Sequence, residues 1–138
     1  MLPVDAETVR LTLHVLGACV WIGGQFVLAV EVSVVRAHGG REATRAVARR
    51  FQVVAWPAYV VLVATGIWNL LAVAAADQST EYLTTLSIKL ALVVAAGVGA
   101  AAHTVVSRTR PALGGALAGF GLAASVAAAY VGVALGSG

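Results

Sequence analysis

The sequence predicts an all-α fold, a four-helix transmembrane bundle. The first observation is composition: 60% of the 138 residues are hydrophobic and 11% are charged, unlike a soluble globular domain. The second is length, because four apolar runs are each long enough to cross roughly 30 Å of hydrocarbon as a helix. The third is that these runs show no strict apolar–polar alternation, which favours helices over barrel strands. We therefore expect a single integral membrane domain over residues 1–138.

The four predicted spans follow one another with short connections. Glu31 interrupts the first span late, and the second is expected to begin as a helical extension over residues 41–51. The fourth begins at Pro111, a favourable first helical residue. The expected bounds of the spans are about 9–35, 51–76, 84–107 and 111–135.

Basic residues predict the orientation of these spans. The connection between the third and fourth spans holds Arg108 and Arg110, whereas that between the second and third holds only Asp77 and Glu81. Because basic loops stay on the cytoplasmic side, both termini are expected outside. Orientation in the membrane also accounts for the basic residues, so nucleic acid is not expected as a partner. The most basic connection, between the first two spans, carries Arg36, Arg41, Arg45, Arg49 and Arg50.

One face of the first span holds the candidate functional residues. At 100° per residue this face combines an imidazole, two small residues, an indole and an amide. An ionisable side chain within a span is costly enough to suggest function. His14 is either a ligand for a metal ion or a haem iron, or a histidine satisfied by a neighbouring hydroxyl or carbonyl group. The face consists of His14, Gly17, Trp21, Gly24 and Gln25.

Two clusters are expected at opposite depths. An outer cluster would join His14 and Trp21 to Trp68, Asn69 and Lys89. The ammonium group of Lys89 either snorkels to the outer headgroups or holds a haem propionate, a quinone or another anionic group.

The inner cluster pairs Glu31 with His103, near the cytoplasmic interface. These two side chains would form a proton relay or a second ligand pair. In the alternative, Glu31 pairs with a loop arginine.

Other features narrow the chemistry. A methionine-rich path for Cu(I) is missing, because Met1 is the only methionine and Cys19 lies about 140° from His14 around a helix. The usual hydrolase and phosphate-loop motifs are also missing, so cofactor or ion binding is favoured over hydrolysis. Tight helix contacts are expected at two small-residue pairs, Gly115 with Gly119 and Gly97 with Ala101.

The sequence resembles the copper-resistance D (CopD) family of bacterial inner-membrane proteins over about residues 11–106. The likeness rests on His14-x-x-Gly17-x-x-x-Trp21-x-Gly23-Gly24, Arg49-Arg50-Phe51, Thr65-Gly66, and Tyr82 with Leu86 and Lys89. It implies a multi-pass plasma-membrane domain linked to copper handling. His14 and Lys89 are also similar to the histidine and lysine of HemJ-type haem-binding membrane proteins.

Three functions remain open. In the first, the protein serves copper uptake or resistance with His14 as ligand, Trp21 and Gln25 lining the site, and Lys89 closing it. In the second, it is a redox protein that binds haem b through His14, supported by His103 or Lys89. In the third, it is a non-catalytic subunit that packs in the lipid bilayer against a membrane partner protein or copies of itself.

Overall fold

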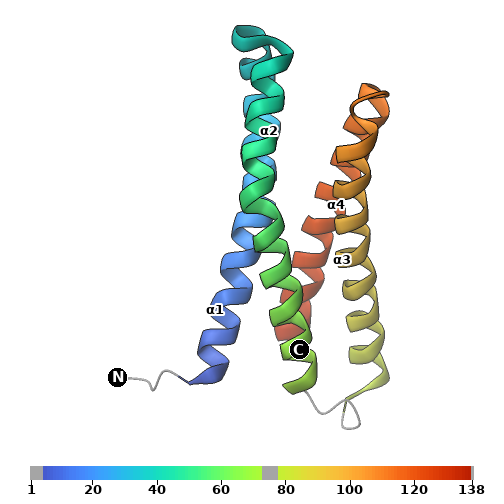
Figure 1. Cartoon of the computed structure of the whole chain (residues 1–138). Helices are drawn as coiled ribbons and strands as arrows, with labels where there is room; N and C mark the ends of the chain where they lie inside the picture. The colour runs from blue at the N-terminus through green and yellow to red at the C-terminus, as the bar shows by residue number, and fades with distance from the viewer. Residues whose placement is uncertain (1–4, 73–77, 138) are drawn as a thin grey trace. The chain divides into compact units, whose positions relative to one another are not determined.

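The computed structural model describes residues 5–72 and 78–137, and the regular structure of these residues is entirely helical. The predicted all-helical class is confirmed. Two compact units make up the chain: unit 1 contains α1, η1 and α2, and unit 2 contains α3 and α4 (Figure 1). The elements are α1 (Ala6–Ala18), the π-helical turn η1 (Cys19–Gly23), α2 (Gly24–Ala72), α3 (Thr80–Val106) and α4 (Pro111–Ser137).

The helices have the length and composition of membrane-spanning segments. Among the described residues, three helical stretches are long and apolar enough to cross a bilayer, at 6–72, 80–106 and 111–136. The predicted number of four spans stays a prediction, because the first two predicted spans fall within one stretch. The predicted end of the second span, residues 73–76, lies outside the described residues.

Unit 1 is a helical hairpin that turns at a single residue. Gly40 has φ 66° and ψ −162°, and it is the non-helical residue within α2. Glycine adopts a positive φ at little steric cost, so the chain reverses there (Figure 1). We call residues 6–39 the first arm and residues 41–72 the second arm. The predicted helical extension over 41–51 is confirmed. Most of the predicted loop between the first two spans is helical as well.

Two glycines of the first arm let the arms approach closely. A Cβ atom on Gly17 would lie 3.1 Å from the carbonyl oxygen of Ala58 and 3.3 Å from the backbone nitrogen of Leu62. A Cβ atom on Gly24 would overlap the ring of Phe51. These contacts run in opposite directions along the two arms, so the arms are antiparallel. The close backbone approach at Gly17 needs a small residue at the interface.

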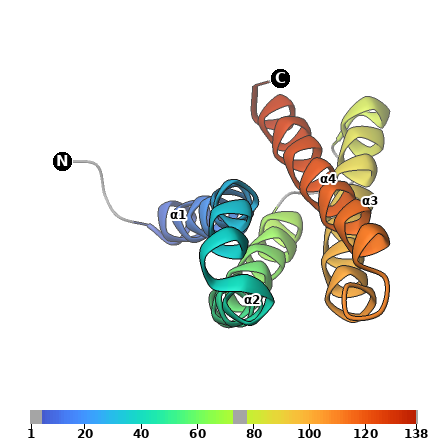
Figure 2. The same ribbon diagram turned by 90° about the horizontal axis from the view of Figure 1, so that it is seen from above.

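Unit 2 is a second hairpin, in which α3 and α4 lie side by side (Figure 2). The Ser79 side chain caps α3 by accepting from the backbone N–H of Tyr82 at 3.1 Å, as N-cap serines do. Helix α4 begins at Pro111, as predicted. At the turn, Nδ1 of His103 donates to the carbonyl oxygen of Gly114 at 2.7 Å.

Unit 2 has a close small-residue contact that the sequence pattern did not single out. A Cβ atom on Gly99 would lie 3.1 Å from the Cα atom of Gly121, so the backbones of α3 and α4 meet there. Within the described part of the chain, a Cβ atom on Gly115 or Gly119 would meet nothing within 4 Å. Helix α4 has small residues on several faces, and spacing alone does not select the one that meets α3, so a contact of the Gly115–Gly119 pair with another helix stays a prediction.

Candidate functional site

His14 is held by the second arm of unit 1. Its Nδ1 atom lies 2.9 Å from the hydroxyl oxygen of Thr65, across the hairpin. Thr65 is 4% exposed, so this contact lies in the packed interface. The Thr65 hydroxyl is directed to its own helix, 2.7 Å from the carbonyl oxygen of Val61 and 3.1 Å from that of Leu62.

These distances assign the direction of the hydrogen bond and the tautomer of His14. A hydroxyl group has one proton, and Thr65 gives it to the carbonyl groups one turn earlier. The Thr65 oxygen therefore accepts from the Nδ1–H of His14. In the neutral ring the lone pair then lies on Nε2. Gly66 adjoins the same ring: a Cβ atom there would lie 3.6 Å from Cε1 of His14.

An aromatic cluster lies deeper along the same interface. The Trp21 side chain is 3% exposed, and its ring centroid is 4.6 Å from that of Tyr59 and 5.7 Å from that of Trp56. Tilted pairs at these distances are favourable for aromatic quadrupoles. Trp21 belongs to the π-helical turn η1, a kind of distortion found frequently at functional sites. The amide nitrogen of Gln25 donates to the Trp21 carbonyl oxygen at 3.0 Å.

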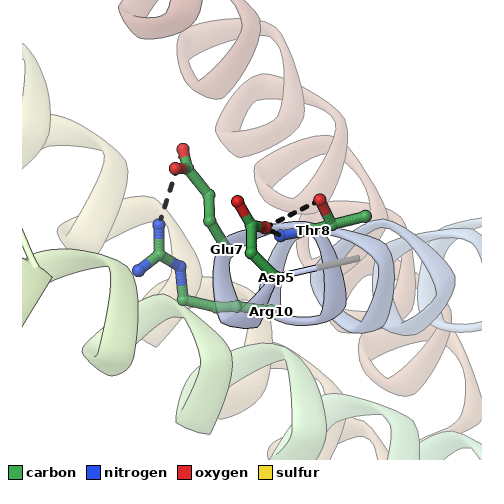
Figure 3. Close-up of polar contacts among 4 residues, drawn as sticks. All are labelled: Asp5, Glu7, Thr8 and Arg10. Atoms are coloured by element: carbon green, nitrogen blue, oxygen red, sulfur yellow. Dashed lines mark hydrogen bonds and ion pairs between the residues drawn. The ribbon is translucent and has the colours of Figure 1, made fainter. Parts of the chain in front are cut away.

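The start of α1 holds a largely buried arginine. Arg10 lies one turn before His14, and its side chain is 13% exposed. One terminal nitrogen of Arg10 is 4.0 Å from the Glu7 carboxylate (Figure 3). Its Nε atom is buried and has no hydrogen-bond partner among the residues that the structure describes. Such an unpaired donor carries a desolvation penalty that a bound acceptor would relieve.

Four of the five residues of the predicted outer cluster belong to unit 1. His14 and Trp21 both face the second arm, as the face of the first span predicts. Trp68 is 45% exposed, whereas Asn69 is half-buried. Lys89 belongs to unit 2, where its Nζ atom would lie 3.1 Å from a Cβ atom on Gly132 of α4. Its approach to His14 stays a prediction.

The predicted inner pair lies in different units. Glu31 is exposed on the first arm, and His103 bonds the Gly114 carbonyl group at the turn of unit 2. Their proposed relay stays a prediction. Among the described residues no group of three or more His, Cys, Asp or Glu side chains is arranged to hold a metal ion. Met1 lies outside the described residues.

Sequence reasoning missed the partners of the first-span face. Thr65 and Gly66 entered only through the family resemblance, and Trp56 and Tyr59 did not enter at all. An antiparallel hairpin turning near Gly40 would have brought Trp56 and Tyr59 level with Trp21. The glycine pair at 39–40, read as a turn, was the available signal.

Comparisons with known proteins gave no match to this chain. No family model, no curated protein and no solved structure matches the chain.

Proposed function

We propose that the protein is a plasma-membrane protein of four crossings that handles copper, with His14 as a ligand to the transported or sequestered ion. Four crossings are supported by the turn at Gly40, because each arm of unit 1 exceeds the roughly 20 residues that one crossing needs. The basic turns at 36–50 and 108–110 then face the cytoplasm, and both termini lie outside.

The hydrogen bond from His14 to Thr65 carries the proposal. Histidines that bind metals usually donate their second ring N–H to an oxygen acceptor, which fixes the tautomer and the ring orientation. Thr65 supplies that acceptor at 2.9 Å, and the lone pair is on Nε2. Trp21 and Gln25 would line the site from the inside, and Lys89 would close it from outside. The resemblance to the CopD family is the reason for proposing copper as the ion.

Copper binding by the purified protein tests this function. We expect one Cu(I) ion per chain in a competition titration with a chromogenic chelator, and loss of binding in His14→Ala. His38→Ala is the matched control, because His38 is exposed at the turn and bonds its own helix at the Val34 carbonyl group. Equal copper binding by the His14→Ala variant and the wild type would remove His14 from the site.

Haem binding is the second candidate, and Arg10 favours it. The residues fit the group in one respect: Arg10 lies one turn from His14, and its buried Nε atom has no partner in the described part of the chain. Arginine pairs well with carboxylates, so Arg10 would hold a propionate while His14 ligates the iron, with His103 or Lys89 in support. Haem b supplies a redox-active iron when bound.

A visible spectrum separates the two candidates. A Soret band that disappears in His14→Ala and weakens in Arg10→Gln would support haem. No Soret band together with stoichiometric copper would support copper handling. If neither group is bound and a membrane protein co-purifies, the chain acts as a partner subunit.

A further inference from the structure

The turn of unit 1 carries a group of arginines that the proposed metal site does not use. We define the basic tip as residues 31–50, the end of the hairpin on both sides of Gly40. Its acidic residues are Glu31 and Glu42 only. In the part of the chain that the structure describes, the one ion pair is that of Arg10, so none involves the tip. Five exposed arginines lie in the tip: Arg36, Arg41, Arg45, Arg49 and Arg50.

The register of the two arms places the charges at a common level. Gly17 lies opposite Ala58 and Leu62, and Gly24 lies opposite Phe51. Counting onward from these contacts at about 1.5 Å per residue puts Arg50 within about two turns of Glu31. Formal charges therefore begin within about 9 Å of the same height on both arms. This height is the polar end of the apolar part of unit 1.

The tip extends beyond this level by the depth of a headgroup layer. Glu31 and Gly40 are nine helical positions apart, which corresponds to about 13 Å. The headgroup region of one leaflet is about 5–8 Å thick. A hairpin inserted up to Glu31 therefore carries its arginines through the headgroup layer and just past it.

The arrangement of the arginines indicates an anionic partner. Arg41, Arg45 and Arg49 are four residues apart, so they share one face of the second arm. Like charges at this spacing destabilise a helix, and an anion bridging them reverses that effect. The positive-inside rule explains the sign of the charge but not its concentration on one face. The exposed Val53 lies four residues after Arg49 on the same face, which suits a layer with phosphates on one side and acyl chains on the other.

We propose that the basic tip binds the phosphate groups of anionic phospholipids. A guanidinium group matches a phosphate with two parallel hydrogen bonds. Each arginine near an anionic leaflet contributes about fivefold in affinity. The ligand is the headgroup of the surrounding bilayer, because the tip is held at the depth where these phosphates lie.

Spin-label selectivity tests the proposal with the whole protein. The protein is reconstituted in phosphatidylcholine vesicles that contain either spin-labelled phosphatidylglycerol or spin-labelled phosphatidylcholine. Electron paramagnetic resonance then gives the fraction of each label that the protein immobilises. We expect the wild type to prefer phosphatidylglycerol, and Arg45→Gln with Arg49→Gln to lower this preference several-fold. The labels occupy both leaflets, so the result does not depend on protein orientation.

Two controls complete the test. Glu42→Gln alters a neighbouring charge in the opposite direction, so the preference should persist or rise. Arg45→Lys with Arg49→Lys keeps the charge and should retain most of the preference. Equal immobilisation of the two lipids by the wild type would overturn the proposal. The proposal would also fail if the arginine variants keep the full lipid preference while the tip binds an acidic peptide.

Discussion

The imidazole of His14 donates from Nδ1 to the hydroxyl oxygen of Thr65 at 2.9 Å, across the two antiparallel arms of unit 1. The Thr65 proton is already used by the carbonyl groups of Val61 and Leu62. The direction of the bond to His14 follows from this, and so does the position of the lone pair on Nε2. One buried threonine thus determines which ring nitrogen can act as a ligand.

Thr65→Val removes this acceptor with little change in side-chain volume. If His14 binds the ion, the variant should bind Cu(I) about 10–100-fold more weakly, because loss of such an orienting group typically has this effect. Thr65→Ser keeps a hydroxyl group and should remain near the wild type. Chelator competition measures both affinities. A Thr65→Val variant with full affinity would show that this hydrogen bond does not orient a ligand.

Trp21→Ala should destabilise unit 1 strongly, whereas Trp68→Ala should not. Trp21 is 3% exposed against Trp56 and Tyr59, while Trp68 is 45% exposed. Truncating a buried tryptophan typically lowers the free energy of unfolding by about 3–5 kcal/mol. Thermal unfolding in detergent, followed by circular dichroism, gives the comparison. Equal losses in the two variants would contradict the packing described for Trp21.

Gly17→Val should also disturb the hairpin, because its added atoms meet backbone rather than flexible side chains. The nearest groups are the Ala58 carbonyl oxygen at 3.1 Å and the Leu62 nitrogen at 3.3 Å. Overpacking of this kind typically lowers stability by about 1–3 kcal/mol. Gly115→Val is the control, since a Cβ atom there meets nothing within 4 Å among the described residues. In the same unfolding measurement, Gly17→Val should be clearly less stable than Gly115→Val.

The helical class and the packed face of the first span were predictable from local pattern. Apolar run length predicts helices, and a period of 100° places His14, Gly17 and Trp21 on one face. Pro111 marked the start of α4 because its ring suits a first helical turn.

The partners across the interface were not predictable in the same way. Pairing of Trp21 with Tyr59 depends on where the chain turns and on the additional residue in the π-helical turn. The hydrophobic period indicates neither the position of the turn nor the presence of the additional residue. The Gly99–Gly121 contact likewise depends on which of several small faces of α4 meets α3.

Acidification should loosen the first turn of α1 through Asp5. The Asp5 carboxylate accepts from the backbone N–H and the hydroxyl of Thr8 at 2.8 and 2.9 Å (Figure 3), and these bonds lower its pKa from the usual 3.8. The cap therefore contributes fully above pH 3.8 and is lost as the pH falls through the lower pKa of the folded state. Amide exchange at Thr8 should accelerate in that range. In Asp5→Asn, which keeps an oxygen acceptor but does not titrate, exchange should show no such step.

The proposed site also requires His14 and Lys89 to face each other. Counted from Ala6 and Thr80, where α1 and α3 begin, both residues lie about 12–14 Å along their helices. If both helices enter the bilayer from outside, the two side chains are at the same depth. His14→Cys with Lys89→Cys, in a Cys19→Ala background, should therefore be joined by a short bifunctional maleimide. His14→Cys with Ser87→Cys is the matched control, because Ser87 is at similar depth but about 160° away around α3. Mass spectrometry of the products gives the yields. A higher yield for the Ser87→Cys pair would mean that Lys89 faces away from His14, and the proposed site would then lose its lysine.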